Sequence, residues 1–149
     1  MDATEILRIL EEDMGVGTFA TVDEAGQPHA RPIHIGLAND KGIFFMTSPK
    51  TKFYDQLVAN PNLAIAAFQT DDYLVQSIRI EGKARKIGRD KLEEVLANNP
   101  FVDQVYPDKK ERDDIQVFHL YEGQAFYHSL SQGHRYVFQI PGDGQARDL

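Results

Sequence analysis

Five side chains in one short stretch of this sequence have the chemistry of an anion-binding site. Thr47, Ser48 and Thr51 supply hydroxyl groups, and Lys50 and Lys52 supply positive charge. They fall where a predicted strand passes into a predicted helix, and the first backbone N–H groups of a helix are free to bind an anion. A phosphate carries nearly two charges and several acceptor oxygens, so it needs such a combination of donors. We expect this stretch to bind an anion of that kind.

Arg31 is a second candidate for the same chemistry. It lies on a predicted strand among apolar neighbours, and Pro28 and Pro32 stiffen that strand. Taken alone, a strand arginine is most often an exposed charge, and Lys52 can equally be a solvated surface lysine. The binding role is favoured because a lysine near a helix start is unfavourable with the helix dipole unless an anion is present.

The composition narrows the classes of function. A chain of 149 residues with 42% hydrophobic residues is expected to form one globular domain. The formal net charge of −7 argues against broad nucleic-acid binding, which needs a basic face. Cysteine is absent, which excludes disulfides, thiolate catalysis and cysteine metal sites. With no membrane-length apolar run and no signal-peptide pattern, we expect a cytoplasmic protein.

Strand and helix signals alternate with closely spaced turns along the chain. A capped helix is expected from Thr4 and ends at Gly15 and Gly17; a helix opening at Ser48-Pro49 and one over Arg89–Ala97 follow. Turns are expected at Asp71-Asp72 and a helix stop at Asn98-Asn99-Pro100. The expected strands are Thr18–Val22, His29–Leu37, Ile43–Thr47, Leu63–Phe68, Tyr73–Ile87, Ile115–Tyr121, Gln124–Ser129 and Tyr136–Ile140.

This order of elements predicts a mainly β (α+β) fold. About eight strands and three or four short helices suit an antiparallel barrel with a few peripheral helices. The first three strands are expected to form a meander. We expect one domain over residues 1–140 and a disordered tail over residues 141–149, which has two glycines and no apolar pattern.

The ordered motifs resemble the flavin-binding split barrels of the pyridoxamine 5′-phosphate oxidase type. The resemblance runs from about Gly15 to Ala84. The residues that carry it are Gly26-x-Pro28-x-x-Arg31-Pro-Ile, Gly42-Ile-Phe-Phe-Met-Thr47, Thr51-Lys52, Leu57-x-x-Asn60-Pro61 and Ile78-Arg-Ile-Glu-Gly-Lys-Ala84.

The resemblance implies a homodimer of split barrels with one FMN at each of two clefts between the subunits. It places a first flavin segment at Arg31, Pro32, Ile33 and His34, and the phosphate grip at Thr47, Ser48, Thr51 and Lys52. Ser77 matches a position where relatives often have a polar side chain near the flavin. The implied activity is that of an FMN-dependent oxidoreductase acting through flavin N5 on a small molecule.

Two departures from the family pattern argue against the oxidase reaction itself. The true oxidase usually has two adjacent basic residues in the grip, whereas Phe53 follows Lys52 here. The oxidase also has a C-terminal segment rich in Arg and Trp that binds the substrate phosphate, and this chain has no Trp. FMN binding survives both changes, so a short flavoprotein with a different substrate is expected.

Two alternatives to an oxidoreductase stay open at this point. The barrel could hold haem, a flavin or the deazaflavin F420 without turnover, or it could bind nucleic acid, which the net charge disfavours. No residue stands out as a catalytic proton donor; His34 and Tyr73 are weak candidates. His29 and His34 are an odd number of residues apart on one strand, so they face opposite sides, and no metal site is expected.

Overall fold

The computed structural model of this chain describes residues 1–149 except residues 72, 98 and 100. The turn expected at Asp71-Asp72 and the helix stop expected at Asn98-Asn99-Pro100 fall partly outside the described residues. The described part has no helix long and apolar enough to span a membrane.

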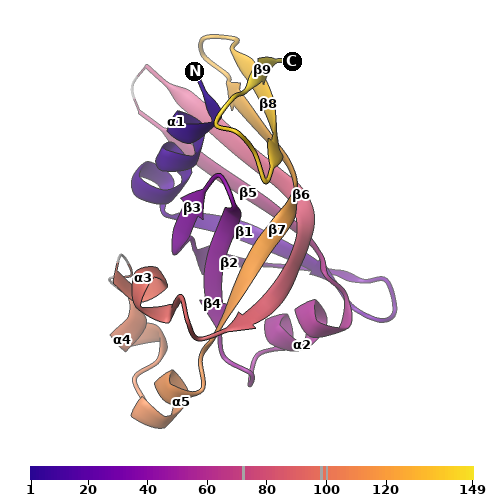
Figure 1. Ribbon diagram of the computed structural model, residues 1–149, viewed down its shortest axis with the longest axis vertical. Coiled ribbons are helices and arrows are strands. Elements are labelled where there is room, and N and C mark those ends of the chain that lie inside the picture. Colours follow the sequence, from indigo (N-terminus) through magenta and orange to yellow (C-terminus); the bar gives the residue numbers. More distant parts are fainter. Residues whose placement is uncertain (72, 98, 100) are drawn as a thin grey trace.

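One antiparallel sheet of nine strands dominates the structure (Figure 1). Its hydrogen-bonded order is β2-β1-β5-β6-β7-β4-β3; in addition, β8 pairs with β7 and β9 pairs with β8. This confirms the expected mainly antiparallel fold with few helices. The strands are β1 (Val16–Val22), β2 (Pro28–His34), β3 (Leu37–Asn39), β4 (Gly42–Thr47), β5 (Asn62–Thr70), β6 (Val75–Gly88), β7 (Gln116–Ser129), β8 (Arg135–Ile140) and β9 (Arg147–Asp148).

Two expectations about the strands were wrong. The segment His29–Leu37 is broken at Ile35-Gly36, so β2 pairs with β1 while β4 pairs with β7, and the first three strands form no meander. A side chain at Gly36 would overlap Val95, so the chain turns where only a glycine fits. The strands expected over Ile115–Tyr121 and Gln124–Ser129 are one continuous strand, β7, because β6 pairs with β7 through Glu122 and Gly123 as well.

Strand β7 is long enough to pair with a different strand along each of its two halves. Its first half pairs with β4 through residues Gln116–Leu120, and its second half pairs with β8 through Gly123–His128. Between the halves, a register shift faces Lys83 and Ala84 of β6, and Gly82 and Gly123 lie too close for either to carry a Cβ. The two backbones therefore approach closely at this point.

Helices cover the ends and one side of the sheet (Figure 1). The N-terminal helix α1 (Ala3–Arg8) continues into a π-helical turn, η1 (Ile9–Met14), and Gly15 ends it in the left-handed conformation. Helix α2 (Lys52–Ala59) follows β4. The segment between β6 and β7 forms α3 (Leu92–Ala97), α4 (Val102–Val105) and α5 (Lys109–Asp113) beside β4.

Two apolar clusters hold these elements together. The larger fills the inner face of the sheet, where Phe19, Phe45, Phe53 and Phe118 pack ring against ring; the Phe19 and Phe45 centroids lie 4.9 Å apart. The smaller lies between β4, β7 and the helical segment and includes Met46 and Tyr106. Because both faces of β4 are covered, every residue of this strand is buried.

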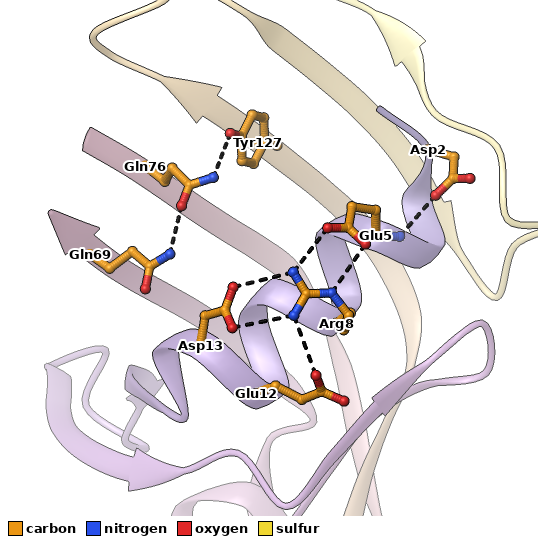
Figure 2. Close-up of polar contacts among 8 residues, drawn as sticks. All are labelled: Asp2, Glu5, Arg8, Glu12, Asp13, Gln69, Gln76 and Tyr127. Atoms are coloured by element: carbon orange, nitrogen blue, oxygen red, sulfur yellow. Dashed lines mark hydrogen bonds and ion pairs between the residues drawn. The ribbon is translucent and has the colours of Figure 1, made fainter. Parts of the chain in front are cut away.

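Two groups of polar contacts lie within the N-terminal helix and across strands β5, β6 and β7 (Figure 2). Arg8 makes ion pairs with Glu5, Glu12 and Asp13 on the outside of the helix. On the sheet, Gln69 donates to Gln76 at 2.6 Å, and Gln76 donates to the Tyr127 hydroxyl at 2.8 Å. Gln76 and Tyr127 are both buried, so the chain of hydrogen bonds satisfies their polar atoms inside the fold.

Backbone hydrogen bonds tie the last nine residues to the rest of the chain. Strand β9 pairs with β8, Ala3 N–H donates to the Gly144 carbonyl at 3.0 Å, and Gly142 N–H donates to the Asp40 carbonyl at 2.9 Å. Such backbone hydrogen bonds need no apolar side-chain pattern, so they could not be predicted from the sequence.

Candidate functional site

The corner between β4 and α2 holds most of the predicted anion site. Thr51 caps α2 by accepting a hydrogen bond from the Tyr54 N–H at 3.1 Å, and its hydroxyl lies 2.9 Å from that of Thr47. The Ser48 hydroxyl accepts from the Lys50 N–H at 3.2 Å. The helix therefore begins three residues after Pro49, later than the proline predicted.

The hydroxyl groups of this corner are used mainly to build it. Thr47 and Ser48 are buried, and Thr51 is half-buried. By contrast, Lys50 and Lys52 are exposed and form no ion pair with another described residue. The Lys52 and Phe53 N–H groups also have no acceptor among the described residues. Unpaired positive charge and free N–H groups therefore meet at the start of α2.

Lys86 adds a positive charge that the sequence did not reveal. It lies on β6, far from α2 in sequence, yet its Nζ donates to the Tyr54 hydroxyl at 2.9 Å in the first turn of α2. The pairing of strands that brings it there cannot be seen in a local motif. One carboxylate, that of the exposed Asp55, shares this turn.

Arg31 lies on the inward side of β2, where its guanidinium is held by four acceptors. Nη1 donates to the Thr21 hydroxyl at 2.8 Å and to the Phe19 and His29 carbonyls, and Nη2 donates to the Gln56 side chain at 2.8 Å. Its Cζ lies 4.6 Å from the centroid of the Phe53 ring. Partial burial lowers the pKa of Arg31, which still leaves it charged at neutral pH.

Pro32, Ile33 and His34, the other residues of the predicted flavin segment, follow Arg31 on β2. Ile33 packs against the main core. Pro32, Ile33 and His34 line a cavity of about 230 Å³ between the sheet and α4. The remaining lining residues are Val16, Met46, Asn99, Phe101, Val105 and Tyr106.

Tyr106 is a site residue that the sequence analysis did not single out. It ends α4, is buried, and lies against both the cavity and the β4–α2 corner. Burial raises the pKa of its hydroxyl, and hydrogen bonding from Thr47 and the Ser48 backbone acts in the opposite direction. Nothing in the local sequence indicates this contact, because it depends on how the segment between β6 and β7 folds back.

Ser77 lies apart from these residues within one chain. On β6 it pairs with Phe68 and His128, on the outer face of the sheet, whereas Arg31 faces inward. Tyr73, a weak catalytic candidate, is 89% exposed. In the described part of the chain, no group of His, Asp and Glu side chains has the arrangement of a metal site.

Comparison with known proteins identifies the family. The family model for pyridoxamine 5′-phosphate oxidase matches residues 4–127. The chain belongs to this family. The pyridoxine/pyridoxamine 5′-phosphate oxidase of Burkholderia mallei is 32% identical over 83 residues, which are 56% of this chain and 38% of that protein. The chain thus spans about two fifths of the length of the curated relatives that it matches.

Solved structures of other proteins share the fold. A NimC/NimA family protein from Clostridium acetobutylicum has a TM-score of 0.72 and 23% identity, covering 91% of this chain and 90% of that one. A haem-binding protein from Mycobacterium smegmatis has a TM-score of 0.63 and 19% identity, covering 96% and 55%. Together with the family match, they confirm the predicted split-barrel fold of the oxidase family.

Proposed function

We propose that this chain is an FMN-binding flavoprotein and an oxidoreductase that acts on a small molecule. Its membership of the oxidase family supports a flavin, and the start of α2 supports a phosphate-bearing one. The single observation that carries the proposal is that Lys50 and Lys52, without ion-pair partners among the described residues, flank free backbone N–H groups.

The residues present suit the phosphate of FMN. Lys50 and Lys52 would pair with its charge, the first N–H groups of α2 would donate to its oxygens, and Thr51 would stand beside them. Thr47 and Ser48 would contribute indirectly, by shaping the turn between β4 and α2. Their internal hydrogen bonds fix the helix start before a ligand arrives, which lowers the entropic cost of binding.

Arg31 would supply a fixed positive charge next to this site. The Thr21 and Gln56 contacts hold the guanidinium in place, so it would not need to reorganise on binding. Pro32, Ile33 and His34 would lie along the flavin ring. Bound FMN would supply hydride transfer at N5, and the chain would position it and tune its surroundings.

The proposal includes a homodimer with FMN between two subunits. Phe68 is 61% exposed beside Ser77, and the neighbouring outer face of β1, β2 and β5 has small side chains at Ala30, Ala64 and Ala66. A second copy packed on this face would cover the exposed ring. It would also let Ser77 reach a flavin held by the partner, which one chain alone does not allow.

Haem binding is the second candidate, because one protein of this fold binds haem. A haem ligand would have to come from a side chain such as His34, which lines the cavity beside α4. That cavity, about 230 Å³, is smaller than the roughly 300–1,000 Å³ of sites that bury drug-sized ligands. The exposed lysines at the start of α2 suit a phosphate, so they favour FMN over haem.

A comparison of FMN with riboflavin tests the proposal, since the two differ only in the phosphate. We expect the purified protein to bind FMN at least about tenfold more tightly than riboflavin. Lys52→Glu should remove this preference, whereas Arg147→Glu, on β9 at the opposite end of the molecule from α2 (Figure 1), should keep it. Equal affinities of the wild-type protein for FMN and riboflavin would refute the phosphate site, and a Soret band on adding haem with no FMN binding would favour the second candidate.

A further inference from the structure

The cavity between β2 and α4 has a lining unlike that of a site for a phosphorylated substrate. Its apolar residues are Val16, Pro32, Ile33, Met46, Phe101 and Val105, and its polar ones are His34, Asn99 and Tyr106. None of the described residues that line it is an acid, a lysine or an arginine. A charged group entering such a cavity would lose its hydration and gain no partner of opposite charge.

The size of the cavity limits what can occupy it. At about 230 Å³, it is below the usual size of sites that bury drug-sized molecules, so whole FMN or a peptide helix would not fit inside. A single-ring compound would. Val16, Phe101 and Val105 leave apolar surface exposed around the cavity, at 42%, 46% and 60%, which a ring in the cavity would partly cover.

The polar residues of the cavity indicate which chemical group its ligand should carry. Asn99 accepts a hydrogen bond from the Phe101 N–H through Oδ1 at 2.8 Å, and its Nδ2 group, which can only donate, has no acceptor within the described part of the chain. The His34 imidazole can donate or accept according to its tautomer. A few polar groups in an otherwise apolar lining are typical of small-molecule sites. Here they favour a ligand with an acceptor oxygen, such as a carbonyl.

We propose that this cavity binds the substrate, an uncharged ring compound with a hydrogen-bond-accepting oxygen. The inference rests on the proposed function, because Pro32, Ile33 and His34 belong both to the cavity and to the predicted flavin segment. Because these three residues would contact the flavin ring, the cavity that they line would lie beside that ring. The proposed substrate is therefore uncharged and carries no phosphate group.

A matched pair of probes tests this assignment directly. Benzamide and benzoate have nearly the same shape, but only benzoate is charged at neutral pH. Saturation-transfer NMR on the full chain, with and without FMN, should show benzamide binding at least about tenfold more tightly than benzoate. Val105→Arg, at the exposed edge of the cavity, should reverse the preference. Val58→Arg, on the exposed side of α2 and outside the cavity, should leave it unchanged.

The outcomes separate the two proposals. Benzamide binding that Val105→Arg reverses supports the cavity assignment even if FMN does not bind, in which case the flavin proposal alone fails. Wild-type protein that prefers benzoate or binds neither probe overturns the assignment, as does a reversal by Val58→Arg as large as that by Val105→Arg. If circular dichroism shows that Val105→Arg does not fold, Val16→Arg on the other side of the cavity takes its place.

Discussion

At the scale of single residues, Arg31 both stabilises the fold and belongs to the proposed binding site. Its side chain ties β2 to β1 through Thr21 and to α2 through Gln56, and it stacks on Phe53. The sequence suggested a ligand-binding arginine, and the structure gives that arginine a role in stability as well. The two roles are compatible, because a charge held by neutral acceptors keeps its attraction for a nearby anion.

Arg31→Met should therefore destabilise the protein even without a ligand. Loss of the hydrogen bonds to Thr21 and Gln56 should lower the free energy of unfolding by about 2 kcal/mol, measured by urea denaturation. The matched control is Arg147→Met, because Arg147 is exposed on β9 and forms no ion pair with another described residue. A change below about 0.5 kcal/mol for Arg31→Met would contradict the role given to its contacts.

Thr51 allows a second test at this scale. Thr51→Ala removes the oxygen that accepts from the Tyr54 N–H, so it should cost about 1 kcal/mol of unfolding free energy. Thr51→Ser keeps the capping oxygen and should recover most of that loss. If the alanine and serine variants unfold at the same urea concentration, the capping hydroxyl does not support the start of α2.

At the scale of elements, local signals located most strands and helices but not their partners. The strand signals around Arg31 and Thr47 were correct, whereas the break at Gly36 and the continuity of β7 through Gly123 depend on contacts between distant segments. The same distinction between local signals and distant contacts applies to the residues of the candidate site. Thr51 and Lys52 could be read from a helix-start pattern, but Lys86 and Tyr106 reach it only through the folded sheet.

Gly42 shows how tightly β4 is packed against β7. It has a φ of +132°, and a Cβ there would overlap the Leu120 carbonyl oxygen. Gly42→Ala should therefore cost about 3 kcal/mol or more, or prevent folding, as followed by thermal unfolding. Gly26→Ala is the control, because Gly26 has a φ of +83° but open space around its Cα, and it should cost about 1 kcal/mol. Equal losses in the two variants would contradict the close approach of β4 and β7.

At the scale of the whole molecule, His119 links stability to pH. Its ring stacks on Phe44, Nε2 contacts the Lys41 carbonyl, and burial together with the charges of Arg85, Lys91 and Lys41 lowers its pKa. Above the unfolded value of 6.5, the imidazole is neutral in both states and this contribution to stability is complete. As the pH falls below that value, the unfolded chain binds the proton first, so stability is lost.

Urea unfolding measured between about pH 7.5 and pH 5 should show this loss. His119→Gln should reduce the dependence of the unfolding free energy on pH over that interval, since it removes the titrating group. The variant will also lose the ring stacking, which changes its absolute stability. The comparison should therefore use the slope of the unfolding free energy against pH. An unchanged slope would contradict the proton linkage assigned to His119.

The central claim for the molecule is that it binds FMN. The most direct measurement is the visible absorbance spectrum of the purified chain after incubation with FMN and removal of free flavin by gel filtration. The account predicts flavin absorbance that travels with the protein at one FMN per chain. A colourless protein after this treatment would contradict it.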